Sequence, residues 1–241
     1  MRNQTNTALV KRNKQIAQYL FLFSFAVLIA AFIFNFNFNP QTASSLELIL
    51  PLLALPLGLI ATLASVRMTN LWVREPRPEN ALRDGLKGLS NKSVLFNYYH
   101  LPARHVLICP QGVFAITTRY QDGTFTVKGD EWTTEGGAMS AFMRTFRRDG
   151  IGNPNQDALA AAAHVQKLLA PIAPGVTVKP LIVFTDPRAQ LNVDNPAIPV
   201  LHASPKLKPN IIEFMRAYPK EAYDSLTVEQ IEAFEAATVK G

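Results

Sequence analysis

Two long uncharged apolar stretches near the N-terminus constrain this chain more than any other feature of its sequence. No charged residue occurs in Gln15–Leu46, and within it Ile16–Phe34 is a run of 19 residues dominated by Leu, Phe, Ala, Ile and Val. A second uncharged run of 19 residues covers Leu48–Val66. A helix rising about 1.5 Å per residue needs roughly 20 apolar residues to cross a hydrocarbon core of about 30 Å. Each stretch is therefore predicted to span a membrane, and together they predict a two-span hairpin over residues 15–67.

A cleavable signal peptide explains the first stretch less well. Fourteen residues precede it, its apolar core exceeds the roughly 7–15 residues usual in signal peptides, and no A-x-A-like site follows before the second stretch. The second stretch contains Pro51, Pro56 and Gly58. These residues are tolerated in a helix within lipid, where neighbouring groups re-satisfy the freed carbonyls.

The lysine and arginine residues around the two stretches predict their orientation. Four precede the first stretch and three follow the second, whereas the connection between the stretches has none: Arg2, Lys11, Arg12 and Lys14, then Arg67, Arg74 and Arg77. By the positive-inside rule both ends of the hairpin lie in the cytoplasm. The sequence therefore predicts an integral membrane protein with two spans, a cytoplasmic N-terminal segment 1–14 and a cytoplasmic C-terminal domain.

The net charge of the chain carries little information about nucleic acid. The 241 residues have a formal charge of +6, but five of these units fall within residues 1–77, and residues 78–241 carry only +1. A hydrophobic fraction of 48% with 17% charged residues excludes intrinsic disorder. The single cysteine, Cys109, excludes an intrachain disulfide framework and a CxxC metal knuckle. His100 and His105 lack the further ligands that a zinc site needs, and are expected to be ordinary hydrogen-bonded histidines.

Residues after the linker 68–78 alternate between helical and β-favouring patterns. Asn153-Pro154 places a cap residue before a proline at the first helical position, and predicts a helix that ends at Leu169, before Pro171. The apolar run Val176–Phe184 predicts a strand buried on both faces. The remaining predicted elements are a helix over 79–89, a meander of strands at 93–99, 105–109, 113–120 and 124–128, a strand at 198–202, and helices at 206–217 and 227–237. This order predicts an α/β fold, a mixed sheet flanked by helices over 79–216, with a C-terminal helical tail at 217–241.

Several short motifs occur in a characteristic order in this part of the chain. They are Pro110-Gln-Gly-Val-Phe-Ala-Ile-Thr-Thr-Arg-Tyr-Gln-Asp-Gly123, then Trp132, then Asn153-Pro-Asn-Gln156 opening a helix, then Leu181-Ile-Val-Phe184. In this order and spacing, residues 79–216 resemble the nuclease-related domain, NERD, of the restriction-endonuclease-like PD-(D/E)xK superfamily. The resemblance implies a restriction-endonuclease-like mixed sheet and a metal-dependent phosphodiester-cleaving site.

The positions that match the family's catalytic site hold the wrong residues for that chemistry. Phosphodiester cleavage needs carboxylates to hold Mg²⁺ and a lysine to position the attacking water. The resemblance places the first acid at Arg104, and the Glu-x-Lys pair at Thr117 and Arg119. An acid expected in the first helix falls on Leu89. Arginine stays protonated and threonine alone is a poor ligand for a hard cation, so the resemblance implies a pseudo-nuclease without a metal or other cofactor.

The alternative is an active membrane-tethered nuclease that binds Mg²⁺ through relocated acids. Asp122, Asp130 and Glu131 lie nearby in the sequence and are the candidates. Aspartate is also common in turns for conformational reasons, which accounts for these residues without catalysis.

A basic amphipathic segment, Met139–Arg148, offers a second kind of surface. Its apolar residues follow helical spacing, and three arginines, Arg144, Arg147 and Arg148, lie on the other side. Such a segment contacts an anionic lipid surface, packs its apolar face on the domain, or contacts nucleic acid phosphates.

Three functions therefore remain open. The leading hypothesis is a membrane-anchored, catalytically silent NERD-like binding or scaffolding module, whose partners are the lipid bilayer and an anionic lipid or a protein. The second is the tethered nuclease. The third is a structural membrane protein that contacts another membrane protein through Pro51, Pro56 and Gly58.

Overall fold

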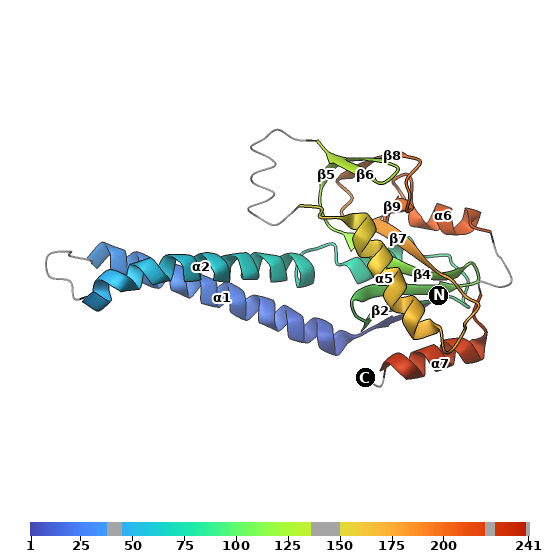
Figure 1. The fold of residues 1–241 in the computed structure, drawn as a ribbon, viewed down its shortest axis with the longest axis horizontal. Coiled ribbons are helices and arrows are strands. Elements are labelled where there is room, and N and C mark those ends of the chain that lie inside the picture. The colour runs from blue at the N-terminus through green and yellow to red at the C-terminus, as the bar shows by residue number, and fades with distance from the viewer. Residues whose placement is uncertain (38–44, 136–149, 220–224, 240–241) are drawn as a thin grey trace. The chain divides into compact units, whose positions relative to one another are not determined.

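The computed structural model describes residues 1–37, 45–135, 150–219 and 225–239 (Figure 1). They form two units, and each is described by itself. Residues Thr7–Glu75 make a helical unit, whereas residues Met1–Asn6 and the described residues from Pro76 onward make an α/β unit.

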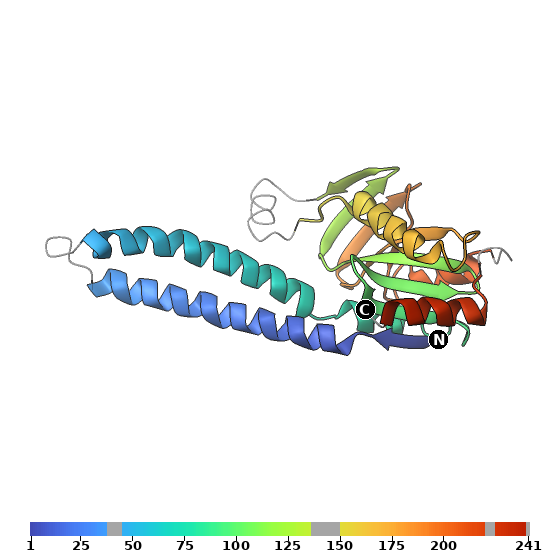
Figure 2. The same ribbon diagram turned by 60° about the horizontal axis from the view of Figure 1, so that its bottom comes forward.

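The helical unit contains two long helices that lie side by side in opposite directions, α1 (Thr7–Asn37) and α2 (Ser45–Trp72) (Figures 1 and 2). Small residues are buried between them: Ala17, Ser24, Gly58, Ala61 and Ser65. A Cβ atom added to Gly58 would lie 3.5 Å from Cγ1 of Val27, an ordinary van der Waals distance, so α1 and α2 are in contact at this position. Large apolar side chains point outward instead, and Phe32 is 71% exposed.

One helix among the described residues is long and apolar enough to cross a membrane. This candidate span covers Thr7–Phe34, with a mean hydropathy of 2.3. The helix α2 covers the second predicted stretch, but the side chains of several of its first residues lie outside the described set and it does not meet the same criterion. Among the described residues, one candidate span of the predicted pair is therefore supported.

The α/β unit is built on a six-stranded mixed sheet with the order β1-β2-β3-β4-β7-β9. Its strands are β1 (Arg2–Thr5), β2 (Val94–His100), β3 (Ala103–Cys109), β4 (Gly112–Arg119), β7 (Val178–Phe184) and β9 (Val200–His202). The central strands β2, β3 and β4 are antiparallel, whereas β7 and β9 continue parallel to β4. The edge strand β1 pairs parallel with β2 and was not predicted.

A second, three-stranded sheet has the order β6-β5-β8, with β5 (Gly123–Lys128), β6 (Glu131–Thr134) and β8 (Ala189–Asp194). The predicted four-strand meander is therefore wrong at its last strand. Although β5 follows β4 closely in the chain, it pairs with β6 and, in parallel, with β8. The buried Phe125 and Val127 pack with Ile182 and Phe184 of β7, and this apolar contact draws β5 out of the main sheet.

Four helices complete the described part of this unit: α3 (Pro78–Gly85), α5 (Pro154–Leu169), α6 (Ile211–Ala217) and α7 (Val228–Val239). The helix α5 begins and ends where the sequence predicts, and the side chain of Asn153 accepts a hydrogen bond from the amide of Gln156 at 3.0 Å. Leu89, predicted to end the first helix, lies in the turns that follow α3.

Apolar residues cover both faces of the six-stranded sheet. On one face Leu107 and Phe114 pack with Leu82 of α3 and Met215 of α6. On the other face, Val106 and Ala115 pack with a second set of helical residues, which comprises Ala161, Val165 and Leu169 of α5 together with Phe234 of α7. Alternate residues of one strand thus serve two cores, as expected for a sheet buried between two helical layers.

Candidate functional site

The positions that match the family's catalytic residues lie on neighbouring strands. The register of β3 and β4 pairs His105 with Ile116, so Arg104 and Thr117, one residue further along each strand, are neighbours. Arg119 follows two residues later on β4 and shares the face of Thr117, because side chains alternate along a strand. The sheet therefore brings Arg104, Thr117 and Arg119 to one face, the face that α5 covers.

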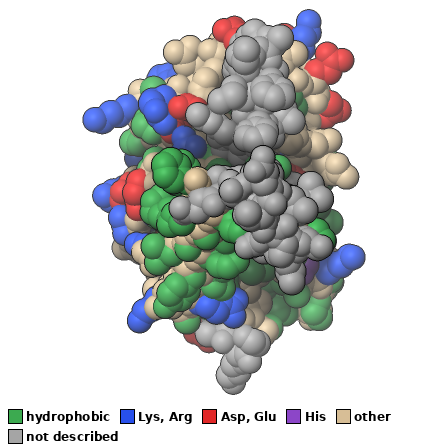
Figure 3. All heavy atoms as spheres, turned by 90° about the vertical axis from the view of Figure 1, so that its left-hand side faces the viewer, with side chains coloured by type: hydrophobic (Ala, Val, Ile, Leu, Met, Phe, Trp, Pro, Cys, Tyr) green, Lys and Arg blue, Asp and Glu red, His purple; other side chains and the backbone are tan. Residues whose placement is uncertain are grey.

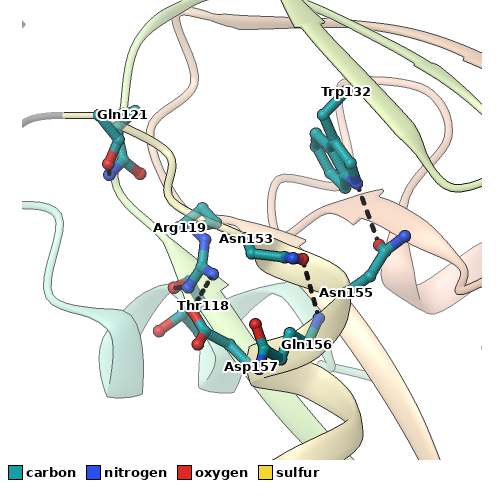
Figure 4. Close-up of polar contacts among 9 residues, drawn as sticks. Thr118, Arg119, Gln121, Trp132, Asn153, Asn155, Gln156 and Asp157 are labelled. Atoms are coloured by element: carbon teal, nitrogen blue, oxygen red, sulfur yellow. Dashed lines mark hydrogen bonds and ion pairs between the residues drawn. The ribbon is translucent and has the colours of Figure 1, made fainter.

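Arg119 is held by an acid from α5. Its guanidinium donates a hydrogen bond to the carboxylate of Asp157, in the first turn of the helix (Figure 4). The Arg119 side chain is 11% exposed and that of Asp157 is 57% exposed, so a nearly buried cation has its counter-charge at the surface. The carbonyl of Arg119 also accepts from the amide of Thr185 at 2.8 Å, which fixes the end of β4 against the end of β7.

The start of α5 is anchored to the small sheet through Asn155. Its side-chain oxygen accepts from the indole nitrogen of Trp132 at 3.0 Å, and its amide nitrogen donates to the Asp130 carboxylate at 3.0 Å (Figure 4). Asn155 is buried, so these bonds satisfy its polar side chain. Trp132 and the Asn153–Gln156 motif thus help to position the helix that carries Asp157.

A second carboxylate, Glu79, lies in the first turn of α3. It accepts from Nε of Arg77 at 3.1 Å and from the hydroxyl of Tyr98 at 2.7 Å, and all three residues are buried. Burial, together with the nearby charge of Glu79, raises the pKa of Tyr98 well above its usual value. The positive charge of Arg104 lowers the pKa of the same phenol, so Tyr98 interacts electrostatically with both Glu79 and Arg104. Glu79 is thus a buried carboxylate in the first turn of α3, whereas position 89, where the resemblance expects an acid, holds the buried Leu89.

His100 and His105 belong to different cores. The ring of His105 is fully buried and its Nδ1 lies 2.8 Å from the side-chain oxygen of Asn97, whereas His100 packs against Phe96 and Phe234. The backbone irregularity between Asn97 and His100 separates them further. Burial lowers the pKa of His100 to about 4 and that of His105 to about 3.

The acids proposed to relocate into a metal site have other partners. Asp122 forms an ion pair with Arg188 at 3.1 Å, and that guanidinium also contacts the buried Asp186. Asp130 is bonded to Asn155, and Glu131 is exposed at the start of β6. Within the described residues no group of three or more His, Cys, Asp or Glu side chains is arranged to hold a metal ion.

The donor set at the family positions does not fit a divalent cation. Arg104 and Arg119 are cationic, and the hydroxyl of Thr117 supplies one neutral oxygen, whereas Mg²⁺ prefers carboxylates. The basic segment with Arg144, Arg147 and Arg148 falls within 136–149, outside the described residues.

Sequence reasoning missed Asp157, Glu79 and Tyr98. The signal for Asp157 was available, because it stands in the first turn of a helix that could be predicted with its boundaries. The signal for Glu79 was its place next to Pro78, a usual helix start. Nothing local pointed to Tyr98, whose positive φ of 66° arises at the irregular end of β2.

Comparison with known proteins identifies one related family. Residues 77–185 match the model of NERD, the nuclease-related domain. No curated protein and no solved structure matches the chain. The matched stretch begins just before α3 and ends just after β7, and so contains the strands and the helix that position Arg104, Thr117, Arg119 and Asp157. The central part of the chain is thus similar to the nuclease-related domain.

Proposed function

We propose that the protein is a membrane-anchored, nuclease-related module that binds a partner without cleaving it. One observation carries this proposal. The face of β3 and β4 that matches the family's catalytic site presents Arg104, Thr117 and Arg119, and the guanidinium of Arg119 is neutralised by Asp157. Arginines stand where a nuclease needs acids and a lysine.

Two carboxylates on helices of this unit are already engaged by arginine. Asp157 accepts from Arg119, and Glu79 accepts from Arg77 and from Tyr98. A hydrogen-bonded guanidinium is a stronger partner for a carboxylate than water is, so a divalent cation has to displace a charge-assisted bond to gain either ligand. The order α3, β2, β3, β4, α5, β7 supports a restriction-endonuclease-like scaffold that is retained without its metal chemistry.

The side chains of the helical unit support a membrane anchor. In water, an exposed Phe or Leu forgoes about 1.5–3 kcal/mol of burial, yet the outward-facing residues of α1 include Phe21, Leu22 and Phe25. The buried positions of α1 hold the small residues Ala17 and Ser24 instead. This distribution is typical of helices packed in lipid, where close backbone contact rather than apolar burial drives association. Figure 3 shows hydrophobic side chains gathered over part of the face that it draws.

We further propose that α2 is a second span and that both ends of the hairpin are cytoplasmic. The basic residues at the two ends of the helical unit, and their absence from the connection, support this orientation. The bilayer is then the first partner of the chain, and a protein or an anionic lipid is the second.

A nuclease assay on the full chain, reconstituted in lipid nanodiscs, tests the proposal. Single- and double-stranded DNA and RNA are incubated with Mg²⁺ or Mn²⁺, and no cleavage above a protein-free control is expected. Metal-dependent cleavage that disappears in Asp122→Ala or Asp130→Ala would establish the alternative, an active tethered nuclease with relocated acids. The matched control is Asp194→Ala, an exposed aspartate on β8.

A further inference from the structure

The first residues of the chain form an integral part of the α/β unit. Strand β1 pairs parallel with β2, in a register that sets Asn3 beside Leu95 and Thr5 beside Asn97. The backbone amide of Arg2 donates to the carbonyl of Ser93 at 2.8 Å, and that of Asn6 donates to the carbonyl of Asn97 at 3.1 Å. Asn6 alone separates β1 from the start of α1.

Asn97 is the buried residue that binds this strand. Its side chain is fully buried, and its amide nitrogen lies within hydrogen-bond distance of three acceptors on β1. These are Oδ1 of Asn3 at 2.8 Å, Oγ1 of Thr5 at 3.1 Å and the carbonyl of Gln4 at 3.3 Å. The side-chain oxygen of Asn97 faces His105 at 2.8 Å. Without β1, the Asn97 amide loses all the partners of its nitrogen.

The other side of β1 is held by the last described helix. Glu235 of α7 accepts from the guanidinium of Arg2 at 2.8 Å and from the side-chain amide of Gln4 at 2.6 Å. Phe234, the preceding residue, is fully buried in the core that α5 and β2 share. The strand therefore lies between an interior amide and a carboxylate on a helix that is itself fixed to the core.

We propose that β1 is an intramolecular clasp, and that the edge of β2 with Asn97 and Glu235 is its binding surface. The occupant is residues 2–5 of the same chain. A buried amide left without partners costs about 1–3 kcal/mol, so the stability of the folded α/β unit depends on residues 2–5. These residues must therefore lie on the same side of the membrane as the unit that they stabilise. The clasp does not depend on the proposed function, and only its consequence for membrane sidedness rests on the proposed anchor.

Crosslinking tests whether the strand is seated as proposed. Arg2→Cys and Glu235→Cys are introduced into a Cys109→Ala background of the full chain in detergent, and treated with a short bismaleimide. An intrachain crosslink is expected, and a control that pairs Arg2→Cys with Asp194→Cys on β8 is expected to give none. Absence of the intrachain product would overturn the clasp, and a product formed only between chains would assign the surface to the first strand of a second copy.

A double-mutant cycle tests whether Asn97 acts through β1. Asn97→Ala and the pair Asn3→Ala/Thr5→Ala are each expected to speed proteolysis of the α/β unit by about tenfold, and the combined variant no more than about twice as much as either. Asn192→Ala, at an exposed asparagine on β8, is the matched control and is expected to leave the rate unchanged. If the effects of the two sets of substitutions on the proteolysis rate multiply in the combined variant, Asn97 does not act through β1. Both experiments use detergent, so their failure would leave the membrane anchor untouched, and failure of the anchor would leave the clasp intact.

Discussion

The guanidinium of Arg119, at the end of β4, donates to the carboxylate of Asp157, in the first turn of α5. This contact joins the strand that holds the family's Glu-x-Lys position to the helix that opens with Asn153-Pro154. An acid in the first turn is also favoured by the positive end of the helix dipole. The pair therefore joins the end of β4 to the start of α5.

Replacing Asp157 with Asn is expected to lower the free energy of unfolding by about 1–2 kcal/mol, because it leaves the nearly buried guanidinium of Arg119 without its counter-charge. The loss is no larger because Asp157 itself is partly exposed to solvent. Denaturant unfolding in detergent measures the change. Asp84→Asn is the control, since Asp84 is half exposed where it contacts Arg83 and Lys87, and a change below about 0.5 kcal/mol is expected there. Equal effects of the two substitutions would contradict the structural role of the Arg119–Asp157 pair.

Restoring the family residues is expected to create a divalent-cation site. The triple variant Arg104→Asp/Thr117→Glu/Arg119→Lys places two carboxylates on neighbouring strands in direct register. Its free energy of unfolding is expected to rise with Mn²⁺ by about 1.4 kcal/mol for each tenfold increase above the dissociation constant, whereas the wild type stays unchanged. The same three positions changed to alanine serve as the control. A triple variant without any Mn²⁺ response would show that the strands hold these positions too far apart to share an ion.

Acid is expected to destabilise the α/β unit from about pH 6.5 downward. The pKa values of His100 and His105 are lowered by burial to about 4 and about 3, whereas both side chains titrate near 6.5 once unfolded. Between these limits the unfolded chain binds more protons than the folded chain. The stability that the neutral histidines contribute is therefore complete above about pH 6.5 and is lost toward pH 4–3, by about 1.4 kcal/mol per pH unit for each histidine. Unfolding free energies measured from pH 7.5 to 4.5 check this, and His105→Asn is expected to flatten the slope. An unchanged slope in that variant would exclude His105 as a source.

Two aspartates on the exposed face of α1 are expected to abolish stable membrane insertion. Phe25 and Ile29 are 54% and 43% exposed within the candidate span, and each aspartate there costs about 2.5–3.5 kcal/mol at the centre of a membrane helix. Carbonate extraction of membranes from expressing cells is expected to release Phe25→Asp/Ile29→Asp but not the wild type. Leu159→Asp, at a residue of α5 that is 55% exposed, is the matched control and should remain in the pellet. Release of both variants alike would argue that the anchor lies elsewhere.

Gly85 is expected to tolerate no side chain. A Cβ atom built there would lie 2.0 Å from the carbonyl oxygen of Ala203, a backbone atom fixed by the end of β9. Gly85→Ala must push α3 away from the sheet, with a loss of about 3 kcal/mol or more in unfolding free energy. Gly175→Ala, where no atom lies within 4 Å of the added Cβ, is expected to change stability by less than about 1 kcal/mol. Thermal unfolding of both variants measures the difference, and a stable Gly85→Ala protein would disprove the close contact.

The elements that local signals specify could be predicted from the sequence. The boundaries of α5 follow from the Asn153 cap, from Pro154 at the first helical position and from Pro171 beyond its end. The strand β7 follows from a nearly unbroken apolar run. In contrast, β1 is the polar tetrapeptide Arg2–Thr5, which has no strand signature of its own and is a strand only because β2 and Asn97 lie beside it. Tertiary contact, not propensity, decides such an edge strand.

The candidate site could likewise be predicted only in part from the sequence. Once β3 and β4 are predicted as neighbours, alternation along the strands places Arg104, Thr117 and Arg119 on one face. The partners of these strands were not predictable, because the pairing of Asp157 with Arg119 depends on how α5 crosses the sheet. The position of Glu79 against Tyr98 depends likewise on an irregular strand end. Long-range packing supplies the residues that the linear pattern leaves out.

The binding surface of β1 also sets an order for biogenesis. Strand β1 is made before its sheet partner β2, which follows some ninety residues later, and Glu235 follows 233 residues after Arg2. At a synthesis rate of about 5–20 residues per second, the first strand waits about ten seconds or longer for its last contact. The two apolar helices, α1 and α2, are made during that time, before any of the strands that β1 contacts. Strand β1 is thus among the last elements of this unit to complete its contacts.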